Sequence, residues 1–242
     1  MFGAIVGFFH TVIYVPLYNA LIFFIGHLPG HDVGFAVIIL TIIVRIILYP
    51  VSRRAVESQL AMKKVGPEVE ELKKKYKDDK TKQHEAIMKL YKERNVSISA
   101  GFWLLLVQIP ILFSLYYMFA RSGLPQVDSA ILYPFVHAPD GVNMLFLGFV
   151  NMAAHQNIIL AALVALSQYL YTRLSMGKRQ DDSPVEASLS KDMARSFDLQ
   201  ARYMMPLMFG VIAYILPAAA PLYYLTANAF MIGQELVSGR RF

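Results

Sequence analysis

The chain of 242 residues contains no cysteine and, for its length, little charge. Without cysteine it can form neither a disulfide framework nor a thiolate nucleophile or a cysteine-ligated metal site. Charged residues make up 17% of the chain and hydrophobic residues 56%, with a mean hydropathy of +0.45. Several apolar runs approach the roughly 20 residues that a membrane-spanning helix needs. These features predict a polytopic membrane protein rather than a soluble domain.

The sequence also lacks the motifs of intramembrane and nucleotide-driven enzymes. It has no Gly-x-Ser-x-Gly, no His-Glu-x-x-His, no phosphate-binding loop and no pair of aspartates in an apolar run. A lone histidine such as His155, near the expected outer end of a span, is typical of a membrane interface. We therefore expect no catalytic residues, no metal site, no cofactor and no enzymatic activity.

Basic residues are concentrated in three segments. Of the 23 Lys and Arg, 13 lie in 51–95, six lie in 173–202 and two end the chain, whereas residues 1–44 contain none. Because Lys and Arg accumulate on the cytoplasmic side of membrane proteins, these segments are predicted to be cytoplasmic. Since the charges flank apolar spans, we interpret them as membrane anchors and expect no nucleic-acid binding.

The apolar runs predict five transmembrane helices, the first of which enters from outside. The long run 203–237 is divided into two helices by Pro217 and Pro221, which indicate a tight outer turn. The predicted core spans are 31–54, 98–121, 157–175 and the pair in 203–237. The predicted connections are an extracytoplasmic loop at 122–156, a cytoplasmic loop at 176–202 and a cytoplasmic tail at 238–242.

The N-terminal segment is apolar but has two interpretations. It contains His10, Pro16 and Asn19, and it lacks the basic start of a signal peptide. Its many aromatic residues are typical of a helix that lies in the membrane interface. We predict an interfacial amphipathic helix over 1–30 on the outer surface, with an additional transmembrane span as the alternative.

Residues 55–97 are predicted to form a cytoplasmic helical hairpin. Val69, Leu72 and Tyr76 repeat at helical spacing, as do Ile87 and Tyr91 after a polar break. One interpretation is a solvated link between two spans. The other is a surface that receives a cytoplasmic partner, because the hairpin is longer than a link requires.

Arg45 lies within an otherwise apolar span. An arginine at the bilayer centre costs at least ~2.5–3.5 kcal/mol. Arg45 lies roughly 12 Å from Arg53, at 1.5 Å per helical residue, which is too deep for complete snorkelling to water. Thr41, Arg45 and Ser52 share one helical face. Arg45 must therefore meet a partner within the protein or face a hydrated cavity.

Uncharged polar residues occur in the other spans. Gln108, Gln168 and Asn228 can each line such a cavity, or equally can hydrogen-bond between packed helices. Glu235 is the obvious acidic partner for Arg45, but it is expected near the cytoplasmic surface and at a different height. The pattern favours a hydrated cavity that attracts an anionic group.

The sequence around Arg45 resembles the first core span of the YidC-type membrane protein insertases. The resemblance extends from about residue 5 to residue 237. It rests on Gly34–Arg45, Tyr49-Pro50, Met62-Lys63-Lys64, Pro67, Lys89–Lys92, Leu106–Ile111, Leu115–Tyr117, Met205-Pro206, Pro217, Leu222–Tyr224, Asn228 and Gln234. The chain departs from the family at Asn95–Gly101, where members usually carry Asn-Pro and a glycine-rich turn. It resembles the minimal five-span bacterial form without the large extracytoplasmic domain.

The resemblance implies an all-α fold with five transmembrane helices around a hydrophilic groove, open to the cytoplasm and closed outward, with Arg45 at its centre. It implies that Gln108, Tyr117, Tyr224 and Asn228 line this groove. Combined with the polar faces above, the predicted substrate-binding groove consists of Arg45, Thr41, Ser52, Gln108, Tyr117, Gln168, Tyr224 and Asn228.

The function implied is that of an insertase and assembly chaperone in the bacterial cytoplasmic (inner) membrane, with the C-terminus in the cytoplasm. Its expected clients are nascent membrane proteins with one or two spans. Further expected partners are the ribosome, the targeting receptor, the Sec translocon and membrane lipids. The alternative function is an anion or solute transporter that uses Arg45, although no internal repeat supports it.

Overall fold

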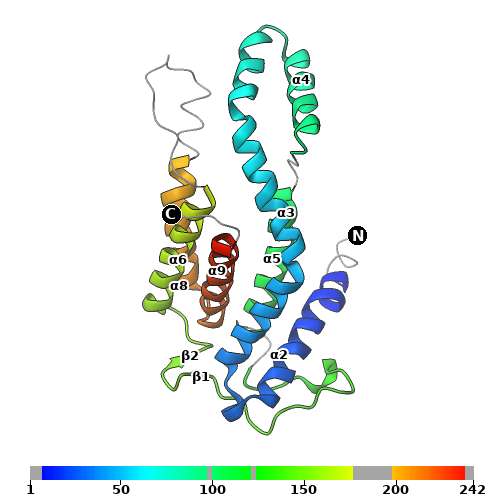
Figure 1. Cartoon of the computed structure of the whole chain (residues 1–242). Helices are drawn as coiled ribbons and strands as arrows, with labels where there is room; N and C mark the ends of the chain where they lie inside the picture. The colour runs from blue at the N-terminus through cyan, green and yellow to red at the C-terminus, as the bar shows by residue number, and fades with distance from the viewer. Residues whose placement is uncertain (1–6, 97–99, 121–123, 177–197, 238–242) are drawn as a thin grey trace. The chain divides into compact units, whose positions relative to one another are not determined.

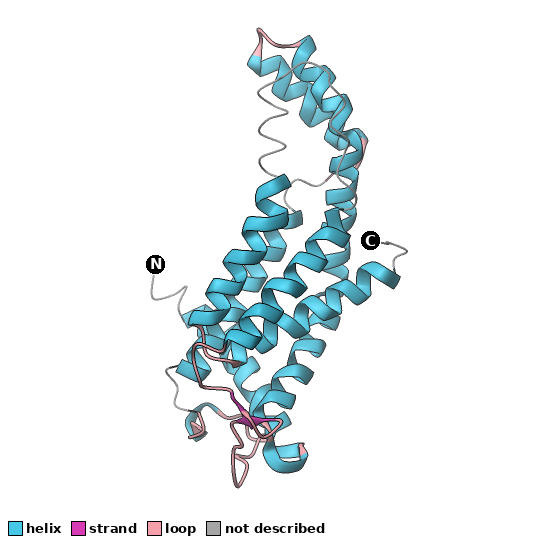
Figure 2. Ribbon diagram, turned by 90° about the vertical axis from the view of Figure 1, so that its left-hand side faces the viewer, coloured by secondary structure: helices cyan, strands magenta, loops and turns pink. Residues whose placement is uncertain are grey.

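Helices make up most of the structure, a computed structural model that describes residues 7–96, 100–120, 124–176 and 198–237. The chain divides into two compact units, one formed by residues 1–45 and 111–242 and the other by residues 46–110. Figures 1 and 2 show the helices as long rods with few extended segments. The expected all-α class is confirmed by these helices and by the comparisons described below.

The long apolar runs of the sequence form helices, as their lengths predict. The helices are α2 (Val15–His27), α3 (Val33–Lys75), α4 (Lys80–Glu93), α5 (Ala100–Ala120), α6 (Ile158–Met176), α8 (Met205–Ile215) and α9 (Ala219–Val237). Single π-helical turns, η1 (His10–Tyr14) and η4 (Gln200–Met204), lead into α2 and α8. Among the described residues, three helices are long and apolar enough to cross a bilayer, namely Gly7–His27, Val33–Ser58 and Ile158–Met176, and Gln108–Ala120 is a shorter apolar helix.

Helices α6, α8 and α9 pack together in the first unit. The buried residues Ala161, Val164 and Ala213 form a small core. Helix α8 approaches α6 closely because Gly210 has no side chain: a Cβ atom at this position would lie 2.9 Å from the Cβ of Ala165. Small residues at such crossings let helix backbones approach each other in membranes. The chain turns between α8 and α9 at residues 216–218, where the sequence predicts a turn at Pro217.

The predicted outer loop 122–156 contains more structure than the sequence indicates. It includes a single 3₁₀ turn, η3 (Ser129–Ile131), and two short antiparallel strands, β1 (Leu145–Phe146) and β2 (Val150–Asn151).

The start of α3 is capped by Asp32, whose carboxylate accepts hydrogen bonds from the N–H groups of Gly34 and Phe35 at 2.7 and 3.2 Å. This cap satisfies donors that a helix start leaves unpaired.

The outer loop is tied to the N-terminal helix by the side chain of Asn19. Its amide nitrogen donates to the carbonyl oxygen of Ile131 at 2.9 Å, and its amide oxygen accepts from the N–H of Tyr133 at 2.6 Å. Beside it, the Tyr18 hydroxyl accepts a hydrogen bond from the N–H of Asp128 at 2.8 Å. These three bonds fix the segment 128–133 against α2.

The second unit contains a helical hairpin. Helix α3 continues to Lys75 without a break at the predicted boundary of 54 and 55, and it turns into α4. Asp79 caps α4 by accepting a hydrogen bond from the N–H of Lys82 at 3.0 Å, and this bond lowers the pKa of its carboxyl group. The buried core of the hairpin consists of Val65, Val69, Leu90 and Val96.

Some predictions fall on residues that lie outside the described ranges. These are the first six residues of the N-terminal helix, residues 97–99 within the departure from the family pattern, residues 121–123 at the boundary of the second core span and the outer loop, most of the cytoplasmic loop at 176–202, and the tail at 238–242.

Candidate functional site

Arg45 is buried within the protein rather than exposed on the surface of its helix. Its side chain is buried, with 5% of the residue exposed, whereas Ile42 and Ile43 just before it are each 37% exposed. Thr41, one helical turn earlier, is also buried, and its hydroxyl donates to the carbonyl oxygen of Val37 at 2.6 Å. Intramembrane arginines almost always face a protein interior or a hydrated cavity. The buried face of α3 therefore presents a cation with a hydroxyl group next to it.

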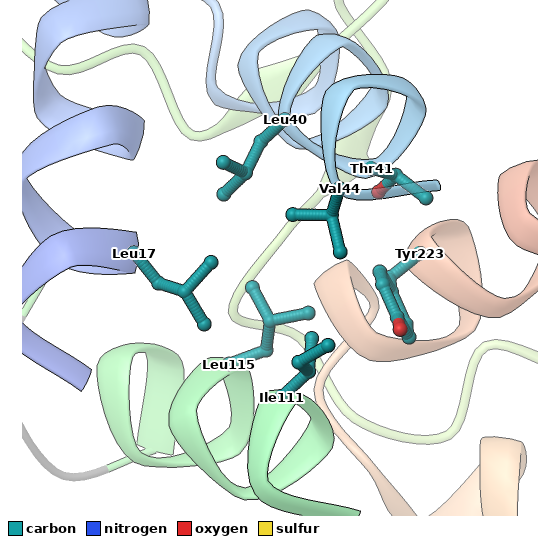
Figure 3. A pocket seen from close by; sticks show the side chains of 7 residues that line it. All are labelled: Leu17, Leu40, Thr41, Val44, Ile111, Leu115 and Tyr223. Carbon is teal, nitrogen blue, oxygen red and sulfur yellow. The ribbon is translucent and has the colours of Figure 1, made fainter. Parts of the chain in front are cut away.

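Apolar side chains surround Thr41. Leu17 from α2, Leu40, Thr41 and Val44 from α3, Ile111 and Leu115 from α5, and Tyr223 from α9 line one small cavity (Figure 3). Except for Thr41 and the Tyr223 hydroxyl, these side chains offer no polar group. The three residues of α3 that line the cavity all precede Arg45, so the cavity lies toward the beginning of that helix. An apolar layer of this kind makes a polar group or ion costly to move past it.

Asn228 makes a hydrogen bond between two helices. It is 1% exposed, and its side-chain amide donates to the Ser167 hydroxyl at 3.1 Å, which in turn donates to the carbonyl oxygen of Val164 at 3.0 Å. This bond joins α9 to α6 and is of the kind that stabilises packed membrane helices. For Asn228, the structure thus gives direct support to the packing interpretation.

The remaining predicted residues of the first unit have different surroundings. Gln168 is half-buried, and its amide lies 3.5 Å from the Thr172 hydroxyl on the same helix. The Tyr224 ring lies against Phe209, with 5.4 Å between ring centroids. Tyr117 is 50% exposed, and its ring contacts that of Tyr14 edge to face. These side chains do not converge on one described cavity.

Two predicted residues, Ser52 and Gln108, belong to the second unit. Ser52 is buried, and its hydroxyl donates to the carbonyl oxygen of Tyr49 at 3.0 Å. Gln108 is half-buried and takes part in a polar interaction. Their membership of one groove with Arg45 stays a prediction.

Glu235 is buried, with 3% of the residue exposed, rather than exposed at a surface. The sequence argument against Glu235 as a partner for Arg45 is a difference in height, which burial does not test. Both residues make polar or electrostatic interactions within the protein. Arg45 is accordingly a buried cation that is already engaged.

Two residues at this site were not predicted from the sequence. Ser167 carries the bond to Asn228, and Tyr223 is buried beside Thr41. Ser167 directly precedes Gln168, so a polar pair on α6 was a visible signal. The buried position of Tyr223 had no signal in the sequence, because the adjacent Tyr224 has the same chemistry.

The model of the 60Kd inner membrane protein family matches residues 24–242 of the chain. This match covers most of the sequence, including Arg45 and the helices around it. The chain therefore belongs to the 60Kd inner membrane protein family.

Curated relatives cover nearly the whole chain. The protein named membrane protein insertase YidC from Clostridium perfringens (strain 13) is 32% identical over 228 residues, which make up 93% of this chain and 87% of the relative. The protein of that name from Oceanobacillus iheyensis is 29% identical over 237 residues, or 96% of this chain and 83% of the relative.

A solved structure has the same fold. A crystal structure described as an active YidC insertase with its first transmembrane domain resolved aligns with a TM-score of 0.55 and 27% identity. The alignment covers 97% of this chain and 47% of that one. The family resemblance seen in the sequence is thus confirmed by both kinds of comparison.

Proposed function

We propose that the protein is a membrane protein insertase and assembly chaperone that receives client segments beside Arg45 and releases them into the bilayer. Its relatives are named for insertase activity over almost the full length of this chain. The observation that carries the mechanism is the buried orientation of Arg45 on a helix whose neighbouring isoleucines face outward.

In this proposal, Arg45 lowers the free energy of bringing a polar or acidic client segment part-way across the membrane. Its guanidinium group has five N–H donors, so it can bind a client carboxylate while it keeps contacts within the protein. Because Arg45 is already engaged, the client competes with or adds to its resident interactions. Burial of the client's apolar helix in lipid then drives completion without chemical energy.

The apolar cavity around Thr41 supports a groove that is closed toward the outside. Apolar side chains from α2, α3, α5 and α9 meet on the side of Arg45 toward the start of α3. Such a layer limits leakage of ions and water past the cation. We further propose that the groove opens toward the cytoplasm, that the C-terminus is cytoplasmic, and that the ribosome, targeting receptor and Sec translocon deliver clients there.

The test is insertion of a single-span client with an acidic extracytoplasmic tail into proteoliposomes that contain the purified protein. Arg45→Ala should reduce insertion strongly, and Arg45→Lys should retain more activity because it keeps the charge. A client with a neutral tail should be less sensitive to Arg45→Ala. The matched control is Arg53→Ala. It removes an exposed arginine on the same helix, whose Nε lies 2.8 Å from Oε1 of Glu57.

Equal insertion of acidic-tailed clients by Arg45→Ala and wild type would contradict the electrostatic role. Far-UV circular dichroism and gel filtration of each variant separate this result from misfolding. Saturable uptake of a small anion into the same proteoliposomes would instead support the transporter alternative, which no residue arrangement in the described structure specifically favours.

A further inference from the structure

The strands β1 and β2 carry an exposed apolar tip. We define the apolar tip as Leu145, Leu147 and Phe149, which are 45%, 55% and 74% exposed. No Asp, Glu, Lys or Arg occurs in residues 141–157. Exposed apolar residues that gather in one place usually mark an interaction surface.

The backbone at the apolar tip is poorly suited to leucine. Leu147 has φ of +53° and Gly148 has φ of +81°, and the N–H of Phe149 donates to the carbonyl oxygen of Phe146 at 3.2 Å. The strands pair Phe146 with Val150, so residues 147–149 form the loop, and positive φ in such a loop favours glycine or asparagine. A bulky residue in the left-handed region is disfavoured. A polar turn residue would thus fit the backbone better, so Leu147 suggests a role for an apolar side chain.

The opposite face of the hairpin fixes its position on the first unit. The Phe146 ring contacts the Phe35 ring edge to face at 5.2 Å, and it fills the space that a side chain at Gly34 would occupy. The backbone of Asn143 exchanges two hydrogen bonds with the chain at the start of α3: its carbonyl oxygen accepts from Val33, and its N–H donates to His31, both at 3.0 Å. The hairpin is therefore held where α3 begins.

The same end of the unit exposes further apolar residues. Ile158 and Ile159, at the start of α6, are 72% and 70% exposed. The residue after β2, Met152, accepts a hydrogen bond from the N–H of Ala219 at the start of α9. Figure 1 shows the two strands near the ends at which α3 and α6 begin. The apolar tip is thus close to the level at which the apolar helices start, which is the level of a membrane interface.

We propose that the apolar tip inserts into the interfacial layer of the lipid leaflet at which α3 begins. Aromatic and large apolar side chains partition into this layer, and the segment carries no charge that would have to be desolvated. The backbone groups of the hairpin are largely paired within it, so shallow insertion leaves few of them without partners. Lipid is the favoured occupant because the tip continues the exposed apolar surface of the spans.

The experiment places the chain's single tryptophan at the tip. Trp103→Phe combined with Phe149→Trp is reconstituted into phospholipid vesicles whose acyl chains are brominated at a shallow or a deep position. We expect a blue-shifted emission and a loss of fluorescence that is greater with shallow than with deep bromines. The control moves the tryptophan to Asp78, an exposed residue between α3 and α4, where neither the shift nor the loss is expected.

A second variant separates lipid contact from turn formation. Leu147→Asn suits the left-handed backbone, so the exchange of the Phe149 N–H with deuterium in detergent should be as slow as in the parent protein or slower. In vesicles, the same variant should weaken quenching of the tryptophan at position 149.

Quenching at position 149 that is no stronger than at position 78 would overturn the proposal. So would unchanged quenching after Leu147→Asn. If the tryptophan is insensitive to lipid but its emission shifts when a client protein is added, the tip binds protein rather than lipid, which also overturns it. None of these outcomes depends on the insertase activity of the groove.

Discussion

The polar residues of the spans differ in how far their hydrogen-bonding groups are already used within the protein. This difference separates residues that pack helices together from residues that can bind a client. The side-chain amide of Asn228 donates a hydrogen bond to the Ser167 hydroxyl, and that hydroxyl donates to a carbonyl oxygen of its own helix. Arg45 has more donors than one partner can use. We therefore expect Asn228 to affect chiefly the stability of the protein and Arg45 to affect chiefly its activity.

The prediction for Asn228 is a loss of stability. Asn228→Leu should lower the free energy of unfolding by about 0.6 kcal/mol and at most ~1.7 kcal/mol, the range found for hydrogen bonds between membrane helices. The measurement is denaturation in mixed micelles followed by circular dichroism. Insertion per folded molecule should change little.

A double-mutant cycle with Ser167→Ala supplies the control. The two substitutions should be less than additive, because each removes the same bond. Full additivity would show that the Asn228–Ser167 bond contributes no coupling. If the folded Asn228→Leu variant inserts much less client than wild type, Asn228 acts as a residue of the groove lining and not only in helix packing.

At the scale of elements, the crossing of α6 and α8 depends on Gly210. A side chain at this position would meet the Cβ of Ala165 and the carbonyl oxygen of Ala161, which lies 3.3 Å from the position of a Cβ. Helix backbones move little to relieve such contacts, because protein interiors are closely packed.

We predict that Gly210→Leu destabilises the protein by about 1–3 kcal/mol, the usual cost of overpacking. The measurement is the midpoint of thermal unfolding in detergent. The matched control is Gly233→Leu on α9, since nothing lies within 4 Å of a Cβ at that position. If the two substitutions lower the midpoint equally, the close approach at Gly210 is not what limits packing.

Helices could be predicted from the sequence far better than their ends. The apolar runs and Pro217 sufficed for the helices and for the turn after α8. The sequence predicted a boundary after residue 54, but α3 continues to Lys75. The Lys- and Glu-rich sequence that follows residue 54 has equally good helix propensity, so charge alone does not mark the end of the helix. The two-residue strands were invisible, since they are too short for an alternating pattern and their turn has leucine where asparagine is usual.

The composition of the groove stays a prediction, and the structure describes the surroundings of its residues one by one. The depth of Arg45 in its span follows from its distance in sequence to Arg53. Its burial in the structure is consistent with that depth. The surroundings of Gln168, Tyr117 and Tyr224 depend on how helices rotate against one another, which helical spacing does not determine. The partner of Asn19 lies more than a hundred residues along the chain, beyond any local pattern.

At the scale of the whole molecule, the N-terminal helix determines how many times the chain crosses the membrane. Gly7–His27 is long and apolar enough to span a bilayer. However, Tyr18 and Asn19, near its middle, hold the loop 128–133, whose first residues are exposed. Irregular, exposed backbone is not tolerated in the hydrocarbon core of a membrane. These bonds favour the interfacial position, whereas Leu17 of the same helix lines a cavity with Thr41 and Val44 of α3, which favours the additional span, so both stay predictions.

The absence of cysteine allows a direct test of this topology. A single cysteine at Phe8→Cys should react with a membrane-impermeant maleimide added outside spheroplasts, because the helix is predicted to stay on the outer surface. Val237→Cys, at an exposed position near the C-terminus, should react only after permeabilisation. If both positions require permeabilisation, the N-terminal helix crosses the membrane.

The bonds of Asn19 also constrain how family members can exchange parts. One side chain recognises the backbone at both Ile131 and Tyr133, so the N-terminal helix and the outer loop form one structural module despite their distance in sequence. A chimera that takes its first helix from one relative and its loop from another must keep an asparagine at position 19 and the same backbone path over 131–133, whatever the side chains of the loop. Recombination that changes the length of the loop would break this module even if every loop side chain were kept.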